Sequence, residues 1–351
     1  MAVQMPRGVQ AEEPILWLGV VGFAPGQRKA IETAIGRAAG SARWRVGPFG
    51  DADGWWVNGA KCRLSAGGRL KVAPGLPTEH TVRLELSEVD RPLAFAEPLA
   101  PSNLDALCVF DAASEASIHE TLARFEKWLQ PVRVRFALGA LLLARDSEGR
   151  RGIYHVSHRG TLLAALDFQQ GVAAISPKAH PPDLWEASWV SRPPSAGLTP
   201  PGFKSCSITE LAWGYVRRTD RDMLPARYRS ETIYYRHVPR VPMRWLRDSQ
   251  LMLLRELSAE PATLRTLAER SAVPVPQLAH DLACLYYAGS VTTSPETVDI
   301  GAGPEVNSVG LWPEGVAATG GARRARYDLT APAMLERRPR PATPAEGGDG
   351  G

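Results

Sequence analysis

The sequence has few cysteines and no long uncharged apolar run. Its four cysteines, Cys62, Cys108, Cys206 and Cys284, lie far apart in 351 residues and form no CxxC pair. This spacing is not that of a disulfide-rich scaffold or of a cysteine-based metal site. The longest apolar run, Phe136 to Ala144, is shorter than the roughly 18–20 residues that a membrane helix needs. We therefore expect a cytoplasmic globular protein with no membrane partner.

The sequence also lacks the short motifs of common enzymes. The stretch GFAPGQRK has two glycines and a lysine but not the GK[ST] ending of a phosphate-binding loop, and no GxSxG nucleophile motif occurs. His155 and His158 have no acidic or thiol neighbour at metal-ligand spacing. We therefore predict no catalytic residue, no metal site and no cofactor, and we interpret the protein as a non-enzyme.

Neither sign of charge is in large excess over the whole chain, but positive charge is concentrated in one stretch. The chain has 41 basic and 37 acidic residues, a net charge of +4. Residues 214–248 contain nine arginines, no lysine and four acids, so this stretch alone carries +5. The rest of the chain is nearly neutral, which favours a local site over a basic coat.

In residues 12–130, predicted strands alternate with predicted helices. Apolar runs and period-two patterns predict strands at 15–21, 44–46, 55–57, 82–86 and 91–99. Helical spacing of apolar residues predicts helices after Pro25, at 103–109 and at 114–129. This alternation is typical of an α/β fold with an open, mostly parallel sheet.

Residues 12–130 resemble the receiver domain of bacterial response regulators, which has a flavodoxin-like sheet. In that family, acidic residues after strand one hold magnesium, an aspartate ends strand three, and a lysine before proline ends strand five. Here Gly22 and Phe23 follow LWLGVV, Asn58 follows GWWV, and Glu97 precedes Pro98. Since acyl-phosphate formation needs the missing carboxylates, the resemblance implies a degenerate receiver that cannot be phosphorylated.

Residues 131–242 have a different pattern, which predicts a β-rich α+β domain. Small hairpins with one helix are expected from residue 131 onward. Residues 176–205 contain seven prolines and predict an extended arm. The arginine-rich segment follows this arm.

Residues 243–297 resemble a winged-helix domain. Three helices are predicted: one carrying Leu251, Leu254 and Leu257, one at 263–270 and one at 276–288. In DNA-binding members of that family the third helix reads the major groove. Here it contains no arginine or lysine, so its charge favours contact with protein over DNA. Gln277 and His280 are its candidate contact residues, and residues 298–351 are expected to be a mostly disordered tail.

Three interpretations of the arginine-rich stretch remain open. The arginines can pair with carboxylates inside the protein, bind a nucleotide or cyclic dinucleotide, or contact a nucleic-acid backbone. The candidate ligand- or partner-binding residues are Arg217, Arg218, Arg221, Asp222, Arg227, Arg229 and Arg236.

Together these features predict a cytoplasmic regulatory or adaptor protein of bacterial signal transduction. A pseudo-receiver is coupled to a winged helix that binds protein partners. Two alternatives are a DNA-binding transcriptional regulator and a receptor for a nucleotide second messenger.

Overall fold

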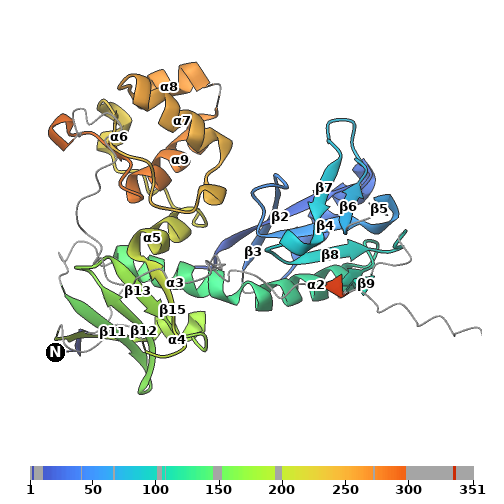
Figure 1. Cartoon of the computed structure of the whole chain (residues 1–351), viewed down its shortest axis with the longest axis horizontal. Coiled ribbons are helices and arrows are strands. Elements are labelled where there is room, and N and C mark those ends of the chain that lie inside the picture. Colours follow the sequence, from blue (N-terminus) through green and yellow to red (C-terminus); the bar gives the residue numbers. More distant parts are fainter. Residues whose placement is uncertain are drawn as a thin grey trace, which may run out of the picture. The chain divides into compact units, whose positions relative to one another are not determined.

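The computed structural model describes residues 2–3, 11–40, 42–65, 68–100, 105–106, 108–144, 152–193, 200–271, 273–297 and 335–336 (Figure 1). The chain divides into two compact units, Ile15–Gln130 with Leu329–Gly351, and Met1–Pro14 with Pro131–Asp328. We call the first the parallel-sheet unit and the second the sheet–helix unit. The division after Gln130 coincides with the predicted boundary there, whereas the predicted boundary after residue 242 lies inside the sheet–helix unit. The expected disordered tail lies outside the described residues, except for 335–336.

The parallel-sheet unit is built on five parallel strands. In spatial order they are β10 (Val109–Phe110), β8 (Leu93–Ala96), β4 (Gly54–Asn58), β2 (Ile15–Val21) and β3 (Arg43–Gly47). When the five strands are numbered along the chain and read from the β3 edge, the order is 2-1-3-4-5. The interior strand β2 is apolar along its whole length because both faces of a covered parallel sheet are buried. The predicted α/β class with a parallel sheet is therefore confirmed.

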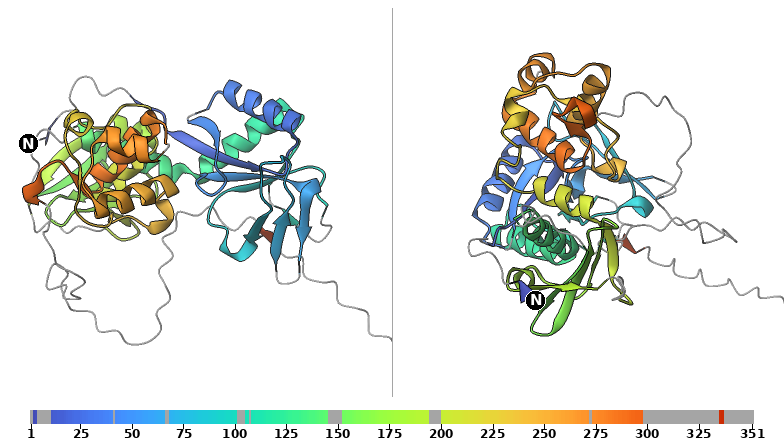
Figure 2. Two further views of the ribbon diagram at one scale, coloured as in Figure 1. Left: turned by 90° about the horizontal axis from the view of Figure 1, so that it is seen from above. Right: turned by 90° about the vertical axis from the view of Figure 1, so that its left-hand side faces the viewer.

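Helices cover one face of this sheet and a second sheet covers the other (Figure 2, left). Helices α1 (Pro25–Arg37) and α2 (Glu115–Trp128) pack on each other, and Phe125 of α2 contacts the rings of Trp44 and Trp56. The second sheet is antiparallel and consists of β5 (Cys62–Leu64), β6 (Arg69–Val72) and β7 (Val82–Glu85). Short 3-10 helices, η1 (Gly59–Lys61) and η2 (Leu86–Glu88), flank it.

Two sequence expectations in this unit are wrong. The strand expected at 82–86 belongs to the small antiparallel sheet and not to the parallel sheet. The described part of the expected helix 103–109 contains strand residues, in β9 (Asp105–Ala106), which pairs with β18 (Leu335–Glu336), and in β10. Short apolar runs fit either a strand or a helix, and here pairing with β8 decides for a strand at Val109–Phe110.

The sheet–helix unit contains an antiparallel sheet of six strands. In spatial order they are β1 (Ala2–Val3), β14 (Ser188–Arg192), β11 (Ile153–His158), β12 (Thr161–Asp167), β13 (Val172–Ile175) and β15 (Lys204–Ser207). Arg159 and Gly160 join β11 to β12 and both have positive φ, 47° and 78°. Two consecutive positive φ values are typical of the tight turn that joins antiparallel strands.

Three helices accompany this sheet: α3 (Gln130–Ala144), α4 (Pro181–Trp185) and α5 (Ile208–Val216). Leu138 and Leu141 of α3 pack with Trp189 of β14 in a common core. Gly139 lies against α5, where an added Cβ would overlap the carbonyl oxygen of Leu211. A residue without a Cβ is therefore needed at this crossing.

The extended arm expected at 176–205 is wrong for its described part. Residues 181–185 form α4, and 188–192 form β14, which pairs with β1 and β11 inside the sheet. The prolines reduced the strand signal, but Pro181 and Pro182 lie in the first turn of α4, where proline is tolerated. The expectation of a single helix in 131–242 is also wrong, because α3, α4 and α5 are all present.

A helical module follows α5 in the same unit. It contains α6 (Arg227–Ser230), β16 (Tyr234–Tyr235), η5 (Met243–Trp245), α7 (Asp248–Ala259), α8 (Leu264–Ser271), α9 (Val275–Tyr287), β17 (Val291–Thr292) and η6 (Pro295–Thr297). β16 pairs with β17, and Ile233 bridges Ala262. The three predicted helices lie within one or two residues of their expected bounds, but Leu251 is exposed and Leu253 takes the buried position instead.

Candidate functional sites

Asn58, which the resemblance to a receiver would place at the phosphoacceptor position, is a buried structural side chain. Its Nδ2 donates a hydrogen bond to the carbonyl oxygen of Gly22 at 2.9 Å, and its Oδ1 accepts one from the Ala60 amide at 3.1 Å. The side chain thereby ties the turn after β2 to the turn after β4. An ionised aspartate has no proton to donate to the Gly22 carbonyl, so this local structure requires an amide.

Gly22 and Phe23 lie in the turn after β2, and neither has a side-chain atom that can bind a metal ion. Gly22 has a φ of 83°, and an added Cβ would lie 3.2 Å from the Ala73 carbonyl oxygen and from Cβ of Asn58. Phe23 is fully buried. A side chain at position 22 would therefore be strained by the backbone conformation and crowded by its neighbours.

The position predicted for Glu97 is wrong. Glu97 follows β8, which is the fourth strand of the parallel sheet along the chain, and not the fifth. The error arises because β7, counted as the fourth strand from its alternating pattern, lies in the other sheet. Asp111 follows the true fifth strand, β10, and caps the turn before α2 by accepting from the Ala113 amide at 2.8 Å.

Glu79, which sequence reasoning missed, fills the carboxyl edge of the sheet beside β2. Its Oε2 accepts from the Gly75 amide at 2.9 Å and from the Gly22 amide at 3.4 Å, and its Oε1 accepts from Nη1 of Arg28 at 3.0 Å. An added Cβ at Gly75 would overlap the Phe23 backbone, so the loop packs directly on the turn after β2. Open parallel sheets of α/β proteins bind ligands at the carboxyl edge, but here the backbone donors at this edge hold the chain's own carboxylate.

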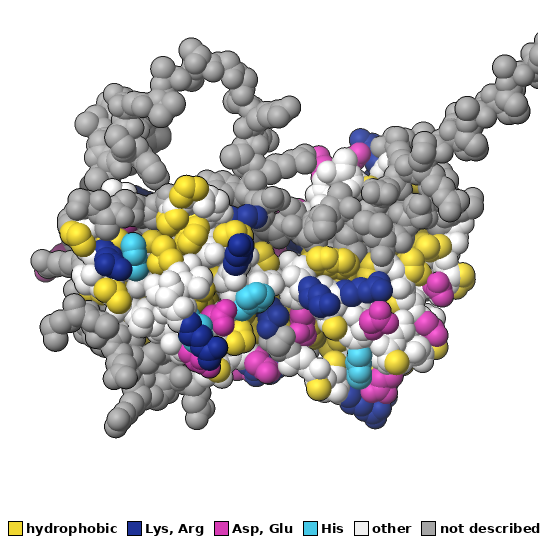
Figure 3. Space-filling model, turned by 90° about the horizontal axis from the view of Figure 1, so that it is seen from below, with side chains coloured by type: hydrophobic (Ala, Val, Ile, Leu, Met, Phe, Trp, Pro, Cys, Tyr) yellow, Lys and Arg dark blue, Asp and Glu magenta, His cyan; other side chains and the backbone are white. Residues whose placement is uncertain are grey.

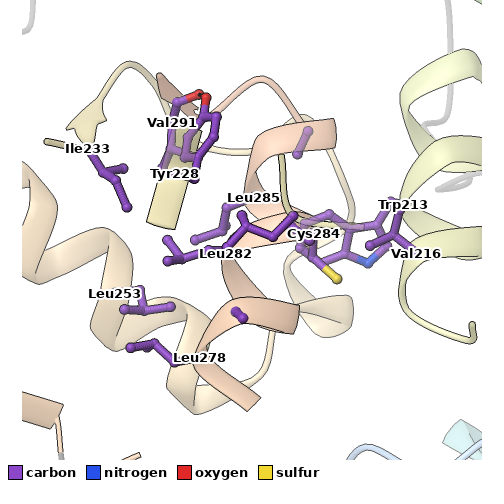
Figure 4. Close-up of a cluster of buried hydrophobic side chains, with 14 of the residues drawn as sticks. Trp213, Val216, Tyr228, Ile233, Leu253, Leu278, Leu282, Cys284, Leu285 and Val291 are labelled. Carbon is purple, nitrogen blue, oxygen red and sulfur yellow. Dashed lines mark hydrogen bonds between the residues drawn. The ribbon is translucent and has the colours of Figure 1, made fainter. Parts of the chain in front are cut away.

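The third helix of the helical module, α9, is buried on most of its surface. From Leu278 to Leu285 every residue except His280 is buried. Figure 4 shows Leu282 and Leu285 beside Tyr228, and Cys284 facing Trp213 and Val216 of α5. Because α5 and α7 pack on it, this helix has no continuous exposed face to present to a DNA groove.

Asp281, the charged residue of α9, has a structural role. Its carboxylate is 0% exposed and accepts hydrogen bonds from Oγ of Ser249 at 2.7 Å and Nε2 of Gln250 at 3.0 Å. Nη1 of Arg247 lies 3.7 Å from Oδ1. Because Gln250 also accepts from the Arg247 amide, Asp281 holds the first turn of α7 against α9.

The two predicted contact residues of α9 have different environments. Gln277 is exposed in the first turn, whereas His280 is half-buried. Burial first, and the charge of Arg247 second, lower the pKa of His280 to about 4. His280 is therefore neutral at physiological pH and adds no positive charge to this surface.

The arginine-rich stretch does not form one site. Arg217 is buried and its Nη1 donates to the Trp245 carbonyl oxygen at 3.2 Å. Arg227 lies over the rings of Tyr228 and Tyr286, at 5.6 and 5.9 Å from their centroids. Arg236 is tied to Ser290 through its backbone amide.

Two of the arginines pair with carboxylates on the surface of the unit. Nε of Arg221 lies 3.1 Å from the carboxylate of Glu12, whose side chain is 13% exposed and also accepts from Tyr215 and Thr219. Arg229 pairs with Asp222. The interpretation as internal ion pairs therefore holds for these two residues and for Arg247, which lies 3.7 Å from the carboxylate of Asp281. Glu12 is a partner that sequence reasoning missed.

A pocket of about 350 Å³ is lined by three of the candidate residues of the arginine-rich stretch, Arg221, Asp222 and Arg229, and by His280 of α9. Its lining consists of Asp220, Arg221, Asp222, Met223, Arg229, Val275, Pro276, Ala279 and His280. Arg218, Arg227, Arg236 and Gln277 are not among these residues. Two arginines face two aspartates, and the histidine is neutral, so the wall of the pocket carries no net charge.

The remaining searches give negative results. The described residues contain no group of His, Cys, Asp or Glu side chains that could hold a metal ion. Among the described helices, none has the length and apolar character needed to cross a membrane. Comparison with protein-family models, curated proteins and solved structures gives no significant match.

Proposed function

We propose that this chain is a non-enzymatic, cytoplasmic regulatory or adaptor protein of bacterial signal transduction. Residues 12–130 act in it as a receiver-like domain that is not phosphorylated. Residues 243–297 act as a winged-helix module that binds a protein partner. The chain works by binding and not by catalysis.

The observation that carries this proposal is the hydrogen bonding of Asn58. Its amide uses both its donor and its acceptor groups within the backbone, so no nucleophile is available at the acceptor position. The strand order 2-1-3-4-5 of the parallel sheet is the order of flavodoxin-like sheets, which supports the receiver-like assignment. Glu79 supports a domain without phosphorylation, because it occupies backbone donors at the same edge.

The helical module supports the second half of the proposal. Three helices and the small sheet of β16 and β17 agree with a winged-helix arrangement. The burial of α9 and its lack of basic residues favour a protein-binding role over DNA reading, because phosphate neutralisation provides most non-specific DNA affinity.

The test is incubation of the full chain with acetyl phosphate and magnesium, followed by intact-mass measurement. We expect no phosphoryl adduct, because Asn58 and Gly22 replace the carboxylates that the reaction needs. An active receiver protein in the same buffer is the positive control. A stoichiometric, base-labile adduct would contradict the proposal.

A nucleotide receptor is supported only by the pocket that contains Arg221 and Arg229. The carboxylates of Asp220 and Asp222 lie in the same wall and would repel a phosphate group. We therefore retain the regulatory adaptor as the proposed function.

A further inference from the structure

The outer face of the small antiparallel sheet carries an excess of positive charge. Its strands alternate apolar residues toward the core with charged residues toward solvent. We call the basic face the five exposed residues Lys61, Arg63, Arg69, Lys71 and Arg83. This face lies in the parallel-sheet unit and shares no residue with the arginine-rich stretch.

Three of these cations lie directly opposite one another across the sheet. Arg63 is in register with Lys71, and Lys71 with Arg83. Like charges directly opposite on neighbouring strands destabilise a sheet. With strands about 4.8 Å apart, the row spans about 10 Å. The fold therefore holds three like charges close together at a cost in stability.

Little acidic charge offsets this row. Glu85 is the acidic residue among the outward-facing strand positions, and it pairs with Arg69 at 3.0 Å. Within the described part of the chain, Lys61, Arg63, Lys71 and Arg83 have no ion pair. On the face of the molecule drawn in Figure 3, by comparison, basic side chains lie among acidic ones.

We propose that the basic face binds the phosphate backbone of a nucleic acid, without reading its sequence. Closely spaced cations suit a polyanion of high charge density. Three of the five residues are arginines, whose guanidinium groups can bind phosphate through two hydrogen bonds. This inference goes beyond the proposed function and does not involve α9.

The composition of the face favours nucleic acid over the other anionic partners. The outward positions of β5–β7 include no apolar or aromatic side chain, whereas a protein interface has an apolar centre. A helix that lies in a membrane surface likewise inserts apolar side chains. The absence of aromatic residues also means that binding relies on phosphates and not on base stacking.

The test measures binding of the full chain to a labelled DNA duplex of arbitrary sequence by fluorescence anisotropy at several salt concentrations. The triple variant Arg63→Gln, Lys71→Gln, Arg83→Gln removes the row. We expect its affinity at low salt to fall at least about tenfold. The slope of log affinity against log salt should become shallower by about 2–3, close to one per lost phosphate contact.

Two control variants separate this face from charge in general. The variant Arg37→Gln, Arg124→Gln, Arg265→Gln removes the same charge at exposed helix positions, and its slope should stay close to that of the native chain. The variant Gln277→Ala, His280→Ala tests α9 and should bind like the native chain. Equal losses in either control would overturn the proposal.

Three further results also decide the proposal. It is overturned if the native chain does not bind the duplex at low salt. It is also overturned if polyglutamate or phosphatidylserine vesicles bind the basic face more tightly than the duplex does.

A thermal melt checks folding, and the triple variant should melt no lower than the native chain because the row is repulsive. If it does melt lower, Lys71→Gln alone should still make the slope shallower by about one.

Discussion

At the scale of single residues, the side chains of Asn58, Glu79 and Arg28 close the edge of the parallel sheet through hydrogen bonds to the backbone of Gly22 and to each other. Asn58 donates to the Gly22 carbonyl, and Glu79 accepts from the Gly22 amide. Gly22 therefore has both of its backbone polar groups bound by side chains. Arg28 holds Glu79 from α1. Changing any one of these residues exposes an unpaired group at a crowded position.

Asn58→Asp tests this edge directly. The substitution removes the donor to the Gly22 carbonyl and brings a carboxylate against it, so we expect the free energy of unfolding to fall by about 1–3 kcal/mol. Urea unfolding of the native and variant chains measures the difference. The control Gln277→Glu makes the same change at an exposed position and should alter stability by less than about 0.5 kcal/mol. Unchanged stability of the Asn58 variant would show that the hydrogen bond is not important.

At the scale of elements, α9 was predicted from sequence but its surroundings were not. Helical spacing located the helix within one residue at each end, because apolar periodicity and Pro276 are local signals. Its burial depends on α5, about 60 residues earlier in the chain. A signal was present, however, since LACLYY is apolar on all sides of a helix, and such helices are buried.

Asp281→Ala tests how α9 is held to α7. The change leaves Arg247, which is 16% exposed, without this carboxylate and removes the acceptor for Ser249 and Gln250. We expect a loss on the order of 3–5 kcal/mol, as for removal of one partner from a buried pair. The nearby exposed residue Asp248 provides the control, and Asp248→Ala should cost less than about 1 kcal/mol. Similar losses in both variants would contradict the structural role of Asp281.

The basic face shows why charge read along a linear window can miss a surface. Residues 214–248 have the higher local charge in sequence, but their arginines are divided among a buried backbone contact, aromatic rings and ion pairs. The cations of β5–β7 are spread over residues 63–83 and come together only through strand register. Their sequence signal is the alternation of basic and apolar residues in KCRL, RLKV and VRLE.

At the scale of the whole molecule, the sequence predicted classes of structure better than connections between them. The parallel sheet, the division after Gln130 and the three C-terminal helices follow from local patterns. The membership of β7 in a second sheet depends on its pairing with β6, and that of β14 in the six-stranded sheet depends on its pairing with β11, more than 30 residues earlier. Pairing partners have no signature within a single strand, so strand counting assigned Glu97 to the wrong position.

The two units have separate cores, which leads to a prediction about unfolding of the whole chain. One core joins β2, β4 and β8 to the small sheet, whereas the others contain residues 134 to 291 and lie in the sheet–helix unit. Domains with separate cores commonly unfold in separate steps. We therefore expect two transitions by differential scanning calorimetry.

The two stability variants assign these transitions. Asn58→Asp should lower the midpoint of one transition and Asp281→Ala the midpoint of the other, because the hydrogen bonds of Asn58 to Gly22 and Ala60 lie within one unit and those of Asp281 to Ser249 and Gln250 lie within the other. For units of about 120 to 200 residues, a loss of 1 kcal/mol corresponds to a shift of roughly 2–6 °C. The Gln277→Glu and Asp248→Ala controls should leave both midpoints nearly unchanged. A single transition that both variants shift equally would mean that the units unfold together, since a change in either core would then be felt by the whole chain.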